Sequence, residues 1–186
     1  ELGIGNGPIS DIVLLLENRS IAVMHYPFPE GMDGLSAYYG DRPFVVVSSE
    51  APPARSRLNV AHEFGHLILH ENISDGVELD YATFKLVEDQ AWRFAGAFML
   101  PAESFLRDVY STSLDALLQL KKKWGVSVAA IIRRLCVLEI LTQDQAKYLR
   151  IQLQQRGWSK REPGDEDDRT WTRRSGHGGP HISGFA

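Results

Sequence analysis

The chain has 186 residues, of which 44% are hydrophobic and 24% are charged, with a formal net charge of −4. This length suits one medium-sized domain or a domain with a small appendage. The negative charge provides no global positive field that would attract nucleic acid, and no apolar run approaches the roughly 20 residues of a membrane-spanning helix. A single cysteine, Cys136, excludes an internal disulfide and predicts a reducing, cytoplasmic environment.

The N-terminal part of the chain combines one short helix with three strands. Residues 9–17 have an amphipathic pattern that predicts a helix, with Ser10 or Asp11 as its N-cap. The residues Gly40-Asp41-Arg42-Pro43 are typical of a hairpin turn between two strands. Apolar runs of strand composition predict these strands at residues 21–26, 35–39 and 44–48.

Two long helices are predicted in the middle of the chain. Apolar residues at helical spacing predict the first over residues 54–71, behind the strand-breaking pair Pro52-Pro53. A polar loop over residues 73–81 follows it. The second helix is expected over residues 85–99, because Pro101 disfavours helical backbone in the residue before it.

The C-terminal third is predicted to contain a helical region and a polar tail. Residues 114–155 have a helical apolar pattern with little strand signal. Residues 159–186 are charged and then rich in Gly, Ser and His without periodicity, which predicts a mostly disordered tail. We therefore divide the chain into a domain over residues 1–108, a helical module over residues 109–158 and the tail.

The residues His62-Glu63-Phe64-Gly65-His66 form an H-E-x-x-H motif within the first long helix. Side chains at positions i and i+4 of a helix point the same way, so His62 and His66 can direct imidazole nitrogens at one metal ion. Glu63 lies about 100° around the helix, where it can accept a proton from a water on that ion. This pattern is typical of zinc-dependent peptide hydrolysis. It also occurs by chance, but the partly buried helix around it favours the metal interpretation.

A catalytic zinc site needs a third protein ligand. His70 and Glu71 lie on the motif helix itself, where ligand atoms spread over about 12 Å of a straight axis cannot share one ion with the motif. His70 is therefore expected to support the ligands or the structure. Glu78 and Asp80 lie in the polar loop, where solvation is the default. Glu88 is the best placed, near the first turn of a separate helix whose apolar face can pack on the motif helix.

Two segments together resemble the ImmA/IrrE metallopeptidases. Residues 55–70 contain the H-E-x-x-H motif, and residues 88–101 contain a Glu-x-x-Ala-x-x-Phe-Ala pattern that ends in Leu-Pro. The resemblance extends over residues 8–158. It implies an α+β fold, in which a zincin-like metallopeptidase domain with a small twisted sheet packed on helices precedes a helical, helix-turn-helix-like module. Trp92 departs from the family, which often has a small polar residue at this position.

The resemblance also implies a function. His62, His66 and Glu88 match the family's zinc ligands, and Glu63 matches its catalytic base; manganese or iron could occupy the same ligands. Family members cleave or inactivate helix-turn-helix repressors, so a repressor is the expected substrate and regulation of mobile-element or stress-response genes the expected role. Longer relatives carry an N-terminal repressor-like domain, and a chain that starts at Glu1 rather than at methionine fits such an architecture.

Residues 120–135 have the pattern of a helix-turn-helix, with a Gly-containing turn and Ser127 as an N-cap. In one interpretation Lys121–Lys123 and Arg133-Arg134 contact DNA. In the other, which the acidic chain favours, this is a helical subdomain that buttresses the peptidase and exposes its basic residues to solvent. The alternative function is accordingly a DNA- or repressor-binding module with a structural metal and no hydrolysis.

The strand at residues 44–48 precedes the motif helix, and two placements are open for it. As the edge strand nearest the metal, it would pair with an extended substrate through its free backbone groups. As an interior strand, it would have no free edge. In the edge placement, main-chain pairing carries little side-chain information, so a second contact with the repressor is expected to supply specificity.

Overall fold

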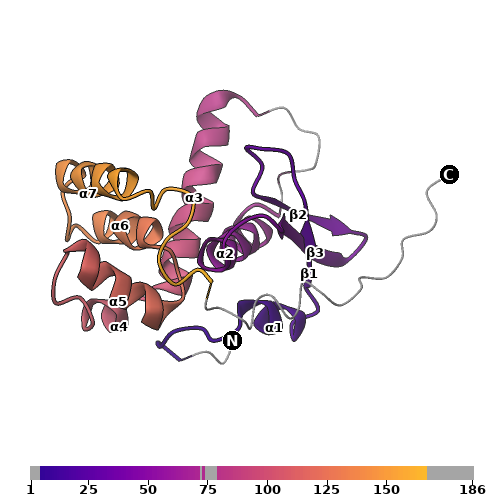
Figure 1. Ribbon diagram of the computed structural model, residues 1–186. Coiled ribbons are helices and arrows are strands. Elements are labelled where there is room, and N and C mark those ends of the chain that lie inside the picture. Colours follow the sequence, from indigo (N-terminus) through magenta and orange to yellow (C-terminus); the bar gives the residue numbers. More distant parts are fainter. Residues whose placement is uncertain (1–4, 72, 74–78, 167–186) are drawn as a thin grey trace.

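The structure is a computed structural model that describes residues 5–71, 73 and 79–166. It has an α+β architecture in which a small sheet and helix α2 occupy one side and the C-terminal helices the other (Figure 1). The predicted α+β class is therefore confirmed. The elements of the described residues are α1 (Ile12–Glu17), β1 (Ala22–Tyr26), β2 (Gly34–Tyr39), β3 (Arg42–Ser48), α2 (Pro53–Leu69), α3 (Tyr81–Met99), α4 (Ala102–Leu106), α5 (Leu114–Trp124), α6 (Val128–Val137) and α7 (Gln143–Gln155).

The sheet has the strand order β1-β3-β2, with β1 parallel and β2 antiparallel to β3. Val45 of β3 is opposite Val23 on one side and Ser36 on the other, so β3 is the central strand. The edge-strand placement of residues 44–48 is therefore wrong, and the interior placement is correct. The physical reason is the tight β2–β3 hairpin, which uses one side of β3, while the parallel pairing with β1 uses the other.

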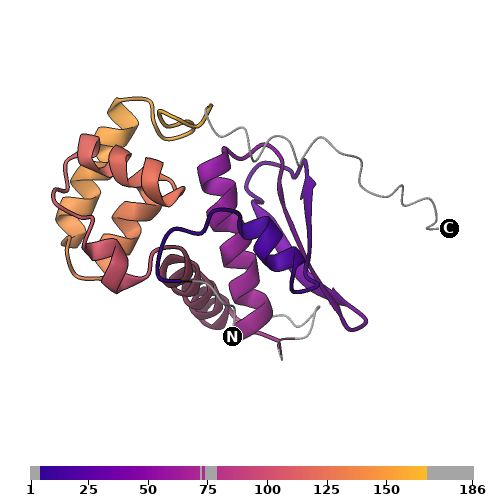
Figure 2. The ribbon, with the colours of Figure 1, turned by 90° about the horizontal axis from the view of Figure 1, so that it is seen from below.

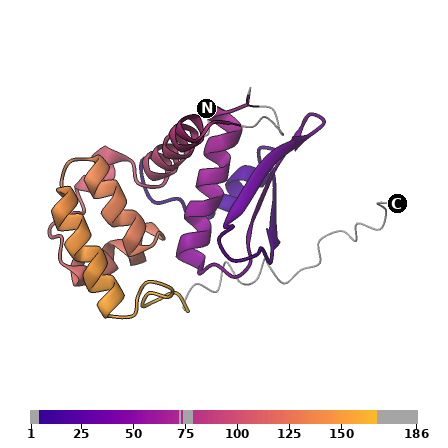
Figure 3. The same cartoon turned by 90° about the horizontal axis from the view of Figure 1, so that it is seen from above.

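Helix α2 lies between the sheet on one side and helices α3 to α7 on the other, as views from below and above show (Figures 2 and 3). Its neighbour α3 packs closely against it at Gly65, where an added Cβ would lie 3.0 Å from Cδ1 of Phe94 and 3.2 Å from the carbonyl oxygen of Ala91. Gly65 of the motif therefore allows the close approach of the two helices. This approach brings side chains of α3 next to the two histidines.

Helix α3 begins four residues before its predicted start, because Asp80 is its N-cap. The Asp80 carboxylate accepts hydrogen bonds from the backbone N–H of Thr83 at 2.9 Å and from its hydroxyl at 2.8 Å. Both bonds contribute to a lowered pKa of Asp80. Glu88 consequently lies in the third turn of α3 rather than in its first turn. Helical residues therefore precede and follow Glu88 and fix the position of its backbone.

The predicted helical region 114–155 is confirmed as three helices with well-defined ends. Ser113 and Ser127 are N-caps of α5 and α6, as predicted for Ser127, and Thr142 forms a capping box with Gln145 at the start of α7. Gly125 ends α5 with φ of 66°, a left-handed conformation that glycine adopts without strain. The chain therefore reverses direction sharply between α5 and α6.

Helix α6 turns its basic residues toward the rest of the protein. Arg134 is buried and donates through Nε to the carbonyl oxygen of Leu100 at 3.0 Å. Arg133 forms an ion pair of 3.4 Å with Asp89 on α3. These contacts occupy both arginines that the DNA-contact interpretation requires, which is the arrangement expected of a buttressing subdomain.

The described part of the predicted tail, residues 159–166, makes buried contacts with α5 and α6. The Glu162 carboxylate accepts from Nζ of Lys121 at 3.0 Å and from the backbone N–H of Val128 at 2.9 Å. Asp165 also accepts from Lys121, at 2.5 Å. The composition of this segment did not predict these contacts. The rest of the tail, residues 167–186, lies outside the described residues.

One continuous apolar core joins the sheet side and the helical side. Buried members from both sides belong to a single cluster, including Val45, Phe64, Leu100, Trp124 and Ile131. Within the described part of the chain, no helix has both the length and the apolar character needed to cross a membrane.

Candidate metal centre

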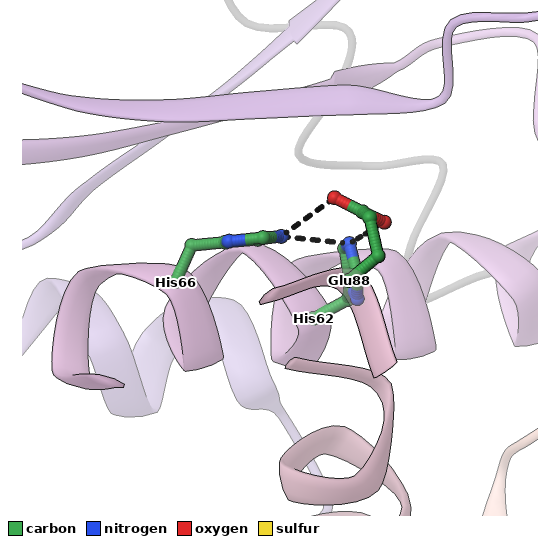
Figure 4. A group of neighbouring side chains, drawn as sticks. All are labelled: His62, His66 and Glu88. Atoms are coloured by element: carbon green, nitrogen blue, oxygen red, sulfur yellow. Dashed lines mark hydrogen bonds and ion pairs between the residues drawn. The ribbon is translucent and has the colours of Figure 1, made fainter. Parts of the chain in front are cut away.

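Three side chains from two neighbouring helices point toward one another (Figure 4). His62 and His66 come from α2, one turn apart, and Glu88 comes from α3. The Nε2 atoms of the histidines are 3.1 Å apart, and the Glu88 oxygens lie 3.4 Å from Nε2 of His62 and 3.2 Å from Nε2 of His66. Among the described residues, these three form the group of donor atoms that could hold a metal ion.

The donor set fits a transition-metal ion in chemistry and in spacing. Two imidazole nitrogens and one carboxylate oxygen make a common ligand set for zinc, with about 2.0–2.2 Å from ligand to metal. Tetrahedral ligands at that radius are roughly 3.3 Å from one another. The histidine nitrogens are 3.1 Å apart, and each has a different Glu88 oxygen near this distance, Oε2 at 3.4 Å from His62 and Oε1 at 3.2 Å from His66. One ligand atom from each of the three residues lies within 4.8 Å of the others, so the cluster is close enough to hold a single metal ion.

Burial keeps both histidines neutral, as metal binding requires. Desolvation, followed by the charge of His66 and then those of Arg133 and His70, lowers the pKa of His62 to about 3. Desolvation and the charge of His70 lower the pKa of His66 to about 4. At neutral pH each imidazole therefore offers a lone pair rather than a proton.

Glu63 lies beside the cluster and faces β2. Its side chain is 7% exposed, and burial raises its pKa to about 7, with a smaller opposing effect from the hydroxyl of Ser36 and a further rise from Glu88. Ser36 Oγ donates to Oε2 of Glu63 at 2.9 Å. Gly34 makes room for the same carboxylate, since an added Cβ there would be 3.0 Å from Oε1. Glu63 is thus a base whose pKa lies near neutral pH.

A cleft of about 480 Å³ gives access to these groups. Residues 34–38 of β2 form one wall, and side chains of α2 and α3 form the other, including Glu63, His66 and Glu88. The edge strand β2 therefore runs along the cleft that contains the base and two of the three donors. Of the described strands, β2 is the edge strand that lines this cleft, so the substrate-pairing role that the sequence suggested for residues 44–48 fits β2 instead.

His70 contacts His66 rather than taking part in the three-residue cluster. Nδ1 of His70 is 3.1 Å from Nδ1 of His66, and its Nε2 is 3.0 Å from Oε1 of Gln90. Since Gln90 Oε1 only accepts, His70 carries its proton on Nε2 and accepts at Nδ1 from His66. This chain of hydrogen bonds leaves the Nε2 lone pair of His66 directed at the cluster. The supporting role expected for His70 is consistent with this geometry.

The other candidates for a third ligand lie elsewhere. Asp80 caps α3 and is exposed, and Glu71 is an exposed residue just beyond the end of α2. Glu78 falls outside the described residues. Of the candidates that the structure describes, Glu88 alone lies with both histidines.

Sequence reasoning missed several side chains that support the cluster. Ser36 on β2 and Gln90 on α3 have ordinary local sequence contexts, and Arg133 on α6 was considered only as a candidate DNA contact. Trp92 was noticed only as a departure from a family pattern, yet its ring stacks on His62 with centroids 4.0 Å apart. The i, i+4 spacing of Glu88 and Trp92 on α3 is the signal that could have indicated a shared surface.

An α+β domain in which two histidines of an H-E-x-x-H helix meet a glutamate of the next helix has the architecture of a metal-dependent peptidase. The chain belongs to a family of that class: the family model Peptidase_M78, described as the IrrE N-terminal-like domain, matches residues 16–136. The predicted family membership is confirmed. No curated protein matches the chain.

Solved structures support the fold. One of 11 matching chains is a Mycobacterium tuberculosis transcriptional regulator, with a TM-score of 0.52 and 20% sequence identity. The match covers 72% of this chain and 42% of the regulator's chain, so this protein spans less than half of that relative's length. At this level of identity the likeness concerns the fold alone.

Proposed function

We propose that this protein is a zinc-dependent endopeptidase in which His62, His66 and Glu88 bind the ion and Glu63 is the catalytic base. The observation that carries the proposal is the convergence of three donor atoms beside a buried carboxylate, in a cleft bordered by an edge strand. Groups with strongly shifted pKa values in such a cleft are typical of catalytic sites.

The chain's own residues have distinct tasks in this mechanism. The two histidines present neutral Nε2 atoms, and Glu88 adds a carboxylate that offsets part of the ion's charge. When bound, a zinc ion supplies Lewis acidity, which polarises the scissile carbonyl and lowers the pKa of a water molecule. Glu63 accepts the proton of the attacking water and delivers it to the leaving amine. Ser36 holds Oε2 of this carboxylate, which leaves Oε1 to transfer the proton.

An extended peptide is the substrate form that suits the cleft. Strand β2 pairs with β3 on one side only among the described strands, so its other side has backbone groups available for another strand. A substrate strand laid along β2 would place its carbonyl groups near Glu63 and the cluster. Because main-chain pairing selects weakly among sequences, we infer that a second contact with a folded substrate supplies the specificity.

The substrate class follows from the family resemblance: a helix-turn-helix repressor, cleaved to change transcription of mobile-element or stress-response genes. The test is incubation of the zinc-loaded protein with the repressor encoded beside it, followed by intact-mass analysis. Two fragments whose masses sum to the repressor plus one water are expected. The Glu63→Gln variant should bind zinc but leave the repressor intact; full cleavage by it would exclude Glu63 as the base.

A short peptide with the cleavage-site sequence of the repressor distinguishes recognition in the cleft from recognition through the second contact. A peptide that spans the cleavage site should be cut at least about 100-fold more slowly, in kcat/KM, than the intact repressor, since it lacks the additional contact. Equal kcat/KM for peptide and repressor would assign specificity to the cleft alone.

A further inference from the structure

Three stacked side chains connect the metal cluster to the helical module. The indole of Trp92 on α3 stacks on the His62 ring, with centroids 4.0 Å apart and an interplanar angle of 29°. The guanidinium of Arg133 on α6 lies over the Trp92 ring, 5.0 Å from its centroid. Arg133 is in turn paired with Asp89 on α3 at 3.4 Å. The contacts therefore run from α6 to one member of the cluster.

The two histidines of the cluster are supported by different kinds of contact. Nδ1 of His66 takes part in the hydrogen-bond chain through His70 to Gln90. Nδ1 of His62 is buried and has no hydrogen-bond partner among the residues that the structure describes. Histidines that bind metals in proteins are normally oriented by a hydrogen bond from this second nitrogen. For His62, another contact must set the plane of the ring.

We propose that Trp92, held by Arg133, is the positioning residue for His62. This inference rests on the proposed function, since it takes His62 to be a metal ligand. The His62 ring can rotate about its Cβ–Cγ bond only by losing its face contact with the indole, so the stack keeps Nε2 directed at His66 and Glu88.

Arg133 limits the movement of the indole in the same way. The cation is attracted to the face of the Trp92 ring, and the ion pair with Asp89 restrains the guanidinium. Arg134, the next residue, attaches α6 to the carbonyl of Leu100 at the end of α3. The helical module is therefore a structural part of the metal site, because α6 supplies Arg133 at a fixed position.

The first experiment compares Trp92→Ala with Trp92→Phe in the full chain. The measurements are the zinc dissociation constant, by competition with a chelator, and the visible absorption of the cobalt-loaded protein, which reports ligand geometry. Trp92→Ala should weaken zinc binding about 10- to 100-fold and shift the cobalt bands, as loss of an orienting contact does. Trp92→Phe keeps an aromatic face and should remain within about 3-fold of the wild type. Tyr81→Ala, which removes an 81%-exposed aromatic of the same helix, is the control.

The second experiment tests the support of the indole. Arg133→Ala should weaken zinc binding about 3- to 10-fold, and Arg133→Lys should retain most of the wild-type affinity. In a protein that already carries Trp92→Ala, adding Arg133→Ala should weaken zinc binding no further. The Arg133 side chain is 42% exposed, so Arg133→Ala tests the contact with Trp92 even if Trp92→Ala does not fold. Suppose that Trp92→Ala and Arg133→Ala both keep normal zinc affinity and normal cobalt spectra, while His62→Ala loses zinc. That result would overturn the positioning role of Trp92 and leave the proposed ligand set in place. Retention of zinc by His62→Ala would overturn the proposed ligand set.

Discussion

The metal cluster and the α5–α7 module bury polar groups in opposite ways. In the module, the Lys121 side chain is 6% exposed and has two carboxylate partners, Glu162 at 3.0 Å and Asp165 at 2.5 Å. At the metal cluster, His62 and the adjacent Glu63 are as deeply buried, at 6% and 7% exposed. Among the described residues, the ion pairs include Glu88 for His62 and none for Glu63. The module neutralises its charges, whereas the cluster leaves donor atoms directed at a common point.

This difference indicates where the chemistry lies. A buried charge that is paired and hydrogen-bonded can stay ionised, whereas an unpaired buried group shifts its protonation equilibrium toward the neutral form. Burial lowers the pKa values of His62 and His66 and raises that of Glu63. Of the basic residues that suggested DNA contact, Lys121, Lys123 and Arg133 form ion pairs within the protein. The comparison therefore favours a catalytic role for the cluster and a supporting role for the module.

The largest expected effect is the loss of the metal. Because zinc-site binding free energies of about 10–16 kcal/mol are shared among a few ligands, His62→Ala, His66→Ala or Glu88→Ala should weaken zinc binding by roughly 1,000-fold or more. Metal content after dialysis, measured by mass spectrometry, is the readout, and chelation of the wild type should abolish peptidase activity and lower Tm.

His70→Ala is the matched control for these ligand variants. It should reduce zinc affinity by only about 10-fold, since His70 orients His66 rather than joining the cluster. Normal zinc binding by Glu88→Ala together with its loss in His70→Ala would reverse the assignment of the third ligand.

The next effect tests the module's paired charges. Glu162→Ala would leave the buried Lys121 with Asp165 as its remaining carboxylate partner. It would also remove the acceptor for the backbone N–H of Val128 at the start of α6. The free energy of unfolding in urea should fall by about 3 kcal/mol, as for other broken buried pairs. Glu166→Ala, an exposed neighbour, is the control and should change it by less than about 0.5 kcal/mol.

In the same variant, zinc affinity per folded molecule should be unchanged. A Glu162→Ala protein of normal stability would mean that the ion pair contributes nothing, and the contrast between module and cluster would then be lost.

The smallest effect concerns the pH dependence of stability. The pKa of Glu63 is about 7 in the folded chain and 4.5 ordinarily, so the folded state binds the extra proton between these values and stability falls as pH rises from 4.5 to 7. Glu63→Gln removes this loss. The metal-free variant should therefore match the wild type near pH 4.5 and exceed it by about 1–3 kcal/mol above pH 7.

Chemical denaturation of both metal-free proteins across this pH range is the measurement. The histidines act with opposite sign, since their lowered pKa values reduce stability as pH falls below 6.5, but this contribution cancels between variant and wild type at each pH. Glu30→Gln, at an exposed position, is the control. A constant difference between Glu63→Gln and the wild type at all pH values would show that Glu63 does not titrate in this range.

Much of the fold and half of the candidate site could be predicted from local sequence. Helical periodicity located α2, α3 and α5–α7, and strand composition located β1 to β3, because both signals repeat within a few residues. The side-by-side placement of His62 and His66 follows from i, i+4 geometry in any straight helix. The prediction that His70 supports the ligands also followed from the axial rise per residue.

What only the tertiary structure decided depends on contacts between elements far apart in the chain. The central place of β3 was not visible locally, because an apolar strand has the same pattern at the centre and at the edge of a sheet. Glu88 reached the cluster because α2 and α3 approach closely at Gly65. Burial then set the protonation of Glu63, and packing of α6 brought Arg133 over Trp92. The sequence by itself determined which donor atoms are available; the packing of distant helices determined which of them meet and how strongly each is desolvated.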